Sequence, residues 1–214
     1  MINKPEGVSV HFEDNTPGIV EIAKQSLKRE KLWLVHRLDK VTSGLLILAL
    51  NANAASVLSK QFADKQIEKF YLAISDKKPK KKQGAIIGDM EKSRNGTFKL
   101  CKTQNSPAIT QFFNKGLNGK RLFILKPSTG KTHQLRVALK SLSSPILGDL
   151  QYTGSHADRT YLHAFALRFT YQGEAISISA LPESGEFFLN DLFSQGYAEF
   201  AHPWELPWPQ IKRS

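Results

Sequence analysis

The sequence predicts a single α+β domain in which helices flank a mixed, mainly antiparallel β-sheet. Strand-like and helix-like patterns alternate along 214 residues, a length that fits one large domain or two small ones. Short strands separated by turn sequences dominate the middle of the chain, as in an antiparallel meander. Neither an internal repeat nor a convincing linker interrupts the pattern, so residues 1–214 are expected to form one domain.

The first part of the chain is predicted to hold three strands and two helices. A short alternating strand is expected at 8–12, followed by a helix with Thr16 as its N-cap and Pro17 as its first residue. A two-sided buried strand at 44–50, a helix at 52–65 and a strand at 67–74 come next. The inward-facing helix residues are expected to be Ile19, Ile22, Ala23 and Leu27, and then Ala55, Leu58 and Phe62.

The second part begins with several short antiparallel strands between 84 and 126. The later elements are expected to be a helix at 132–142, strands at 161–169 and 175–180, and a helix at 186–195. The tail at 203–209 is rich in proline, which opposes regular structure. Its residues Trp204 and Trp208 are expected to cap the core.

The chain is strongly basic, with 30 Lys and Arg against 19 Asp and Glu, a net charge of +11 and a pI near 9.7. Such a charge favours an anionic partner, most often nucleic acid, although solvated lysines without a partner are the alternative. We define residues 77–82 as the lysine loop, because five of its six residues are lysine. Pro79 and mutual repulsion predict a loop. We favour a solvated hairpin tip there over an arm that contacts phosphates.

The composition excludes several kinds of site. The single cysteine, Cys101, rules out an internal disulfide and a Cys-pair zinc site, and six scattered histidines show no metal-ligand spacing. The N-terminus lacks the apolar core of a signal peptide, and the longest apolar run, at 45–50, is too short to span a bilayer. We therefore expect a reduced, cytoplasmic protein without a membrane segment or a metal.

The strongest candidate for chemistry is Asp39. It follows His36 and Arg37 in a turn sequence that runs directly into an apolar strand. An isolated aspartate would ordinarily be a turn or cap residue. At the edge of a buried sheet, however, an aspartate that an arginine keeps ionised can act as a nucleophile or a base.

A second candidate region opens the helix predicted at 132–142. Lys131, His133 and Arg136 beside a helix N-terminus make a corner that favours anions. Arg136 is the candidate partner of Asp39, and a surface arginine on a helix is the alternative. The glycine at 130 does not belong to a phosphate-binding P-loop, because that motif requires another glycine at position 125, where the chain has leucine.

Tyr71 lies in the strand predicted at 67–74. By itself it is typical of an aromatic residue in the core of a strand. Its hydroxyl would equally allow it to stack on a base and move a proton.

These segments together resemble the catalytic domain of the RluA-type pseudouridine synthases, which isomerise uridine in RNA. The resemblance covers residues 3 to 164. Its motifs are Asn3-Lys4-Pro5-x-Gly7, the full His36-Arg37-Leu38-Asp39-x-x-Thr42-Ser43-Gly44-Leu45-Leu46, Lys69-x-Tyr71-x-Ala73, Gly130 to Arg136, Gly148-Asp149-x-x-Tyr152 and Leu162-His163-Ala164. In the fourth motif Lys131 replaces the usual arginine, so one RNA or structural contact is expected to differ.

The resemblance implies an isomerase without metal or organic cofactor that acts on ribosomal or transfer RNA. Asp39 would attack or deprotonate the uridine to release the base, which rotates and rejoins the sugar through C5. Tyr71 would pack on the base and help move a proton, and Arg136 would keep Asp39 ionised. The substrate contacts that the resemblance implies involve Arg37, His36, Leu135, Lys131, His133 and Lys69.

Many members of this family carry an additional N-terminal RNA-binding domain of the S4 type, which we do not expect here because the first motif begins at Asn3. We therefore expect the catalytic domain to hold its RNA alone or with a partner. We expect a monomer with no membrane or DNA partner. The rival hypotheses are a catalytically silent RNA-binding protein on the same scaffold and a hydrolase with a second carboxylate near Asp39.

Overall fold

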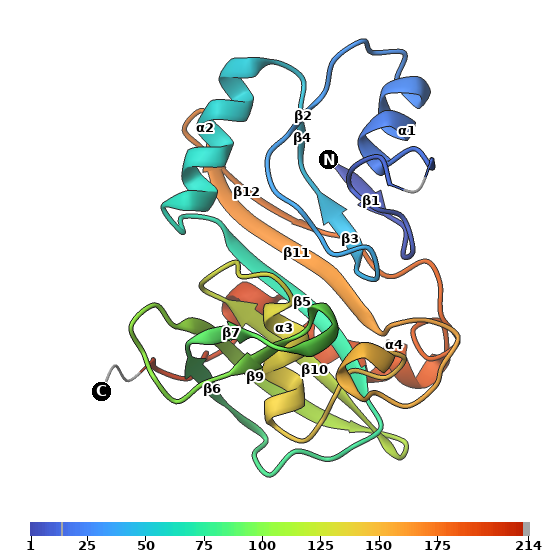
Figure 1. Ribbon diagram of the computed structural model, residues 1–214, viewed down its shortest axis with the longest axis vertical. Helices are drawn as coiled ribbons and strands as arrows, with labels where there is room; N and C mark the ends of the chain where they lie inside the picture. The colour runs from blue at the N-terminus through green and yellow to red at the C-terminus, as the bar shows by residue number, and fades with distance from the viewer. Residues whose placement is uncertain (14, 212–214) are drawn as a thin grey trace.

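The computed structural model describes residues 1–13 and 15–211, which form a mixed sheet with helices packed on it (Figure 1). The main sheet contains β1 (Ile2–Lys4), β3 (Ser43–Leu46), β5 (Glu68–Ser75), β6 (Gln83–Gly88), β9 (Ala108–Leu117), β10 (Lys120–Pro127), β11 (Leu162–Tyr171) and β12 (Glu174–Ser179). Its order is β1-β3-β11-β5-β10-β9-β6, with β12 also paired to β11. Only β3 and β11 run parallel. The predicted fold class is therefore confirmed.

Smaller elements surround this sheet. Two short ribbons pair β2 (Trp33–Leu34) with β4 (Leu48–Ala49), and β7 (Met90–Lys92) with β8 (Phe98–Leu100). The helices are α1 (Ile19–Ser26), α2 (Ala52–Ala63), α3 (Gln134–Ser141) and α4 (Asp191–Tyr197). Single 3-10 turns lie at Arg94–Gly96, Leu150–Tyr152, Ala198–Phe200 and Pro203–Glu205.

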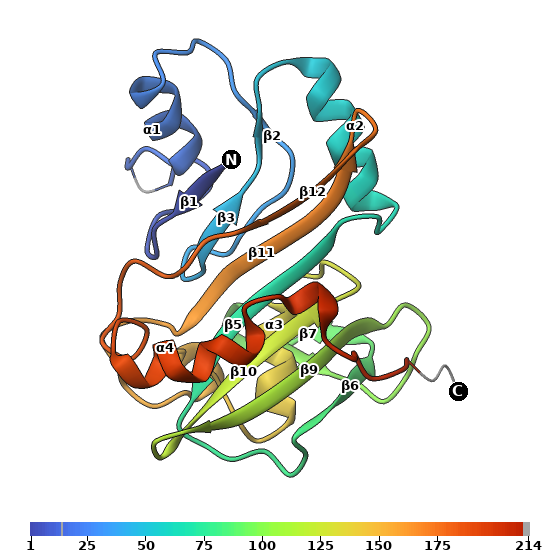
Figure 2. The ribbon, with the colours of Figure 1, turned by 180° about the vertical axis from the view of Figure 1, so that it is seen from behind.

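The main core lies where the sheet is covered on both faces. Figures 1 and 2 show α3 on one face of β5, β10 and β9 and α4 on the other. This double cover explains why the consecutive β10 residues 122–125 are all apolar and fully buried, since neither face of the strand meets water. Trp204 and Trp208 pack against Phe70 at ring-centroid distances of 6.5 and 5.9 Å, so the expectation that they cap the core is confirmed.

The prediction was wrong for the first strand. Residues 8–12 form no strand; β1 lies at Ile2–Lys4 instead and pairs with β3. Val10 is buried, but Phe12 is 65% exposed, and Ser9 uses its carbonyl to accept from Ile19 N–H at 2.9 Å. The local alternation of residues 8–12 therefore did not indicate a sheet partner.

The first helix begins two residues later than predicted. Thr16 closes a two-residue bridge with Glu13, and Gly18 rather than Thr16 is the N-cap. A side chain on Gly18 would meet the backbone of His11 at 2.4 Å, which explains the glycine at this close approach. Of the predicted inward face, residues 19 and 23 are buried, whereas residues 22 and 27 are 40% and 53% exposed.

Other boundaries also shifted. The strand predicted at 44–50 is divided into β3 and β4, which join different sheets, and Leu50 is 58% exposed. The helix predicted at 186–195 begins only at Asp191, where the Asn190 side chain accepts from Phe193 N–H at 2.8 Å. The antiparallel meander, the strand at 67–74 and the two late strands were predicted correctly, apart from one to two residues at their ends. Within the described residues, no helix is long and apolar enough to cross a membrane.

Candidate active site

A cleft of about 940 Å³ opens where the turn before β3, the strand β5 and the start of α3 meet. All nine residues that the sequence singled out line it. They are His36, Arg37, Asp39, Lys69, Tyr71, Lys131, His133, Leu135 and Arg136. Three segments separated by up to a hundred residues thus converge on one cavity, whose volume falls within the range of ligand-binding pockets.

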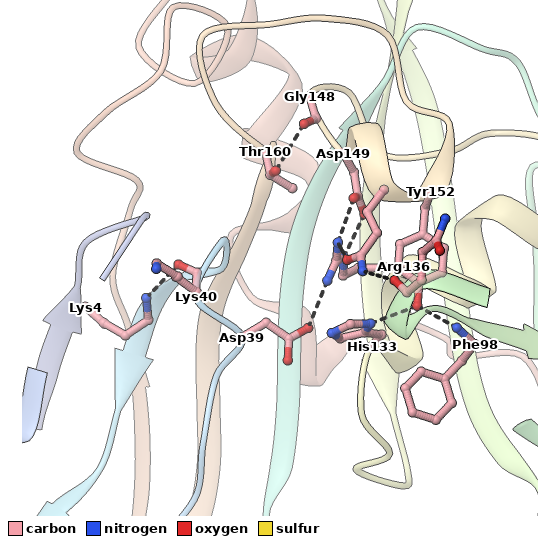
Figure 3. A network of polar contacts seen from close by, with 12 residues as sticks. Lys4, Asp39, Lys40, Phe98, His133, Arg136, Gly148, Asp149, Tyr152 and Thr160 are labelled. Atoms are coloured by element: carbon pink, nitrogen blue, oxygen red, sulfur yellow. Dashed lines mark hydrogen bonds and ion pairs between the residues drawn. The ribbon is translucent and has the colours of Figure 1, made fainter. Parts of the chain in front are cut away.

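Asp39 lies in the turn that leads into β3, with its side chain 22% exposed at the cleft (Figure 3). The turn is closed by Thr42 N–H, which donates to the Asp39 carbonyl at 2.9 Å. The next carbonyl, that of Lys40, accepts from Gly7 N–H at 2.9 Å and from the Lys4 ammonium at 3.3 Å. The turn that presents the carboxylate is therefore held by the segment after β1.

Lys4 is fully buried beneath this turn. Its ammonium also donates to the carbonyls of Pro5 and Val8, each at 2.8 Å. Burial lowers the pKa of Lys4 to about 8, and the nearby Glu6 carboxylate partly opposes that shift. Three carbonyl acceptors give the buried ammonium the partners that it needs in place of water.

A buried polar chain supports the other end of the turn. His163 Nε2 donates to the Ala180 carbonyl at 2.8 Å, so Nδ1 of the neutral ring accepts from the Ser43 hydroxyl at 2.8 Å. Burial lowers the pKa of His163 to about 4, which keeps it neutral. The Ser43 oxygen in turn accepts from Arg159 Nη2 at 2.7 Å. Both ends of the Asp39 turn are thus tied to the body of the protein.

Arg136 is buried, with only 4% of its surface exposed, so it is not a surface arginine of the helix. Its Nε and Nη2 donate to the two Asp149 oxygens at 2.7 Å each, and Nη2 also donates to Gln151 at 2.8 Å. Its Nη1 lies 3.8 Å from Asp39 Oδ2. The predicted partnership with Asp39 is present but loose, because Asp149 is the principal partner.

The charge of Arg136 is strongly supported by these carboxylates. Burial opposes the charge, but the hydrogen bonds and charge of Asp149, together with Asp39, raise the pKa of Arg136 above its ordinary value. The guanidinium also lies over the Tyr152 ring, 4.7 Å from the centroid. We call Arg136, Asp149, Gln151 and Tyr152 the arginine network.

His133 joins this network through Tyr152. It adopts a left-handed conformation (φ 57°) immediately before α3, which makes α3 begin at Gln134 rather than at the predicted Thr132. Tyr152 is fully buried, and its hydroxyl oxygen accepts a hydrogen bond from Phe98 N–H at 3.0 Å. The hydroxyl proton is then donated to His133 Nδ1, 2.8 Å away. Burial lowers the pKa of His133, in keeping with a neutral ring whose proton is on Nε2.

Tyr71 and Lys69 project from β5. Burial raises the pKa of Tyr71, and the Asp39 charge adds to that shift, so the phenol keeps its proton at neutral pH. Lys69 donates to the Thr129 carbonyl at 3.3 Å. Burial, and then the charge of Lys65, lower the pKa of Lys69.

His36 holds the Asp39 turn in place through contacts with Ile47 and Phe62. Its Nε2 accepts from Ile47 N–H at 3.0 Å, and its ring stacks on Phe62 with a centroid distance of 4.3 Å. Burial, and then the Lys69 charge, lower the pKa of His36 to about 3. The ring therefore ties the Asp39 turn to the β3–β4 segment, and a contact of His36 with RNA stays a prediction.

The remaining predicted residues differ in how freely they can meet a ligand. Arg37 is exposed and also borders a second hollow of about 320 Å³ on the other side of the Asp39 turn. Lys131 donates to the Ser106 carbonyl across the cleft. Leu135 is buried and forms part of the apolar wall.

The second carboxylate that a hydrolase would need is supplied by folding but is not accessible. Asp149 reaches the far side of Arg136 from Asp39, yet it is 2% exposed, and both of its oxygens are occupied by the guanidinium. In residues 1–13 and 15–211, no group of three His, Cys, Asp or Glu side chains is arranged to hold a metal ion.

Sequence reasoning missed the supporting roles of Lys4, Asp149, Tyr152 and His163, although all four lie in the quoted motifs. Arg159 lies in none of those motifs. Its contact with Ser43 spans 116 residues, so no local pattern could have indicated it.

Comparisons with known proteins relate this chain and its fold to RNA pseudouridine synthases. A solved structure, "Human RNA Pseudouridylate Synthase Domain Containing 1", superposes with a TM-score of 0.72 and 26% identity, covering 85% of this chain and 78% of that one. The model of the family described as "RNA pseudouridylate synthase" matches residues 1–141. The chain therefore belongs to the RNA pseudouridine synthase family.

Three relatives of similar sequence are described as pseudouridine synthases. An "Uncharacterized RNA pseudouridine synthase" of Haemophilus influenzae is 56% identical, with 88% of this chain and 86% of that protein covered. "Ribosomal large subunit pseudouridine synthase D" of Borreliella burgdorferi is 34% identical, with 90% of this chain but only 65% of that protein covered. "tRNA pseudouridine synthase C" of Haemophilus ducreyi is 30% identical, with 93% of each covered.

Proposed function

We propose that this protein isomerises uridine to pseudouridine in ribosomal or transfer RNA, with Asp39 as the catalytic nucleophile or base. The observation that carries the proposal is the position of Asp39, which is held at both ends of its turn and faces a cleft beside a buried arginine. Such a cleft can receive one nucleotide that has left its stack. Extrusion costs on the order of a few kcal/mol, and less for a loop or bulge.

The geometry supports a role for each catalytic group. Asp39 acts on the nucleotide so that the bond between N1 and C1′ breaks, the uracil turns, and C5 joins C1′. C5 then loses its proton and N1 gains one, so that no atom is lost overall. Tyr71, a phenol that is protonated at neutral pH, packs on the base and helps to move the proton away from C5. Arg136 presents its remaining nitrogen, Nη1, to Asp39 while Asp149 holds the rest of the guanidinium.

The cleft walls supply the proposed substrate contacts. Arg37 is exposed and would hold the flipped nucleotide or fill the space that it leaves, and Leu135 would wall the base. Lys69, Lys131, His133 and His36 are proposed to border the neighbouring nucleotides. We further propose that residues 1–214 act as one catalytic domain and a cytoplasmic monomer, with RNA rather than DNA as partner.

The decisive experiment replaces Asp39 with asparagine. The amide is nearly isosteric but cannot act as a nucleophile or base, so D39N is expected to lose turnover while it retains RNA binding. Pseudouridine formation on transcribed ribosomal and transfer RNA measures the first property, and a binding titration on the same RNA measures the second. Substantial turnover by D39N would refute the mechanism, and binding without turnover by the wild type would favour the silent RNA-binding protein.

The reaction is also expected to proceed without added metal or organic cofactor, because it breaks and remakes bonds to the same base and involves no redox step. Protein treated with chelator and dialysed should retain activity on a short, prefolded RNA, which removes any need for magnesium in RNA folding. Activity that disappears and returns only with a transition metal would contradict this expectation.

A further inference from the structure

The lysine loop is the largest concentration of uncompensated charge that the structure describes. Lys77, Lys78, Lys80, Lys81 and Lys82 are all exposed, and together they supply five positive charges in a chain of net charge +11. Among the described residues, none of the five forms an ion pair. Other lysines of the same half of the molecule do, as in Lys115 with Glu199 and Lys126 with Glu68.

The loop backbone is anchored at its C-terminal end. The Asn114 side-chain amide donates to the carbonyls of Lys81 and Lys82, each at 2.9 Å, and Asn114 N–H donates to Lys82 again at 2.8 Å. Arg121 donates to the Asn114 side-chain oxygen from Nε at 3.0 Å and from Nη2 at 2.6 Å, which fixes the orientation of the amide. Pro79 is buried.

This anchoring argues against a merely solvated hairpin tip. Five like charges in six residues repel one another, and a solvated tip could relax by moving them apart. Hydrogen bonds from Asn114, which is only 6% exposed, instead hold the backbone of Lys81 and Lys82 in place. A surface that is already ordered loses less conformational entropy when it binds a ligand. Closely spaced cationic side chains on a fixed backbone match a row of phosphates.

The loop lies away from the cleft. Tyr71 borders the cleft, and β5 continues from it for four residues to Ser75, about 13 Å at the usual rise of about 3.3 Å per residue. The lysine loop follows and forms the lower end of the molecule in both Figure 1 and Figure 2. Its lysines therefore cannot serve the target nucleotide and must meet a different part of any ligand.

We propose that the lysine loop binds the phosphate backbone of the substrate RNA at a distance from the target uridine. The proposal rests on the proposed function for the identity of the RNA. It makes the loop an RNA-holding surface outside the catalytic cleft, one that contacts only RNAs long enough to extend beyond the target site.

The test compares two triple variants on two lengths of RNA. K78Q/K80Q/K81Q removes three charges from the loop, and K28Q/R29Q/K31Q removes three exposed charges after α1, at the opposite end of the molecule. The probes are oligouridylates of about five and about forty nucleotides, with affinity measured over a range of salt concentrations. Because these probes need no target sequence, the outcome does not depend on whether uridine is isomerised.

The loop variant is expected to bind the long probe on the order of tenfold more weakly than the wild type. Its plot of log affinity against log salt should be shallower by about 2, since each phosphate contact on a single strand contributes about 0.7. The short probe should bind both variants alike, and the control variant should keep the wild-type slope. Equal slopes for the two triple variants would overturn the proposal and direct the search to an acidic protein partner.

A second variant tests the contribution of the ordered backbone separately from that of the lysine charges. N114A keeps every loop lysine but removes the anchoring amide, so the long probe should bind more weakly with an unchanged salt slope. Wild-type affinity in a folded N114A protein would overturn the pre-ordering part of the proposal. If N114A does not fold, the loop variant still decides whether the lysines contact RNA, because its substitutions lie at exposed side chains.

Discussion

Two cationic regions of this protein, the arginine network in the cleft and the lysine loop beyond β5, accommodate their charges in opposite ways. Arg136 is 4% exposed and faces two carboxylates, whereas the loop lysines are exposed and make no ion pair among the described residues. A buried charge must be neutralised by the protein itself, and neutralisation fixes its position. Exposed charges need no internal partner, so they remain available to an external ligand.

The two carboxylates that face Arg136 differ in the same way, one being buried and the other accessible. Asp149 is 2% exposed and accepts two hydrogen bonds of 2.7 Å from the guanidinium. The Asp39 side chain is 22% exposed and stands 3.8 Å from it. Asp149 thus satisfies and orients the arginine, while Asp39 stays accessible to the cleft.

The largest predicted effect follows from breaking the buried pair. R136M should lower the free energy of unfolding by about 3–5 kcal/mol, because Asp149 would be left buried without a counter-charge. Asp149, which accepts two hydrogen bonds of 2.7 Å from the guanidinium, should account for most of this loss, and Asp39, 3.8 Å away, for little of it. Urea unfolding measures the change, and turnover is expected to fall as well.

Double-mutant cycles sharpen this comparison. D149N should recover much of the stability that R136M loses, giving a coupling of about 1–3 kcal/mol, whereas D39N should couple to R136M by less than about 1 kcal/mol. R136M/D149N is expected to remain inactive despite its recovered stability. Equal coupling energies for the two carboxylates would show that the division between them is wrong.

The neutral ring of His36 allows a test of how stability depends on pH. The pKa of His36 is lowered to about 3 from an ordinary 6.5, so its contribution to stability is complete above pH 6.5 and is lost as pH falls toward 3. H36Q keeps an acceptor for Ile47 N–H but cannot titrate. Its unfolding free energy should therefore fall less steeply than that of the wild type between pH 6.5 and 4, by roughly 1–3 kcal/mol. Parallel curves would mean that His36 is not held neutral by burial.

The smallest effect is expected at the exposed charges. K78Q/K80Q/K81Q should change the free energy of unfolding by less than about 0.5 kcal/mol, because the replaced side chains are exposed and unpaired in the described structure. Thermal or urea unfolding of this variant beside K28Q/R29Q/K31Q checks the point. A loss as large as that of R136M would show that the loop lysines are structural after all.

Local patterns predicted the elements whose partners follow closely in the chain. The meander of β6 to β10 and the strand β5 were anticipated because turn residues and apolar runs define them locally. The strand expected at 8–12 failed, since a strand also needs a neighbour, and β3 pairs with residues 2–4 instead. Helix starts shifted where a close backbone approach at Gly18 or a left-handed His133 set the boundary.

For the site, the sequence alone determined which residue types could meet, because the motifs around Asp39, Tyr71 and Arg136 specify their chemistry and their places in turn, strand and helix. Only the tertiary structure decided how the charges are shared. The hydrogen bond from Lys4 to the Lys40 carbonyl joins residues 36 positions apart in the sequence, and that from Arg159 to Ser43 joins residues 116 positions apart. Burial and hydrogen-bond partners depend on what folding brings alongside a residue. For this reason Arg136 contacts two carboxylates unequally, and the five loop lysines have no ion-pair partner within residues 1–13 and 15–211.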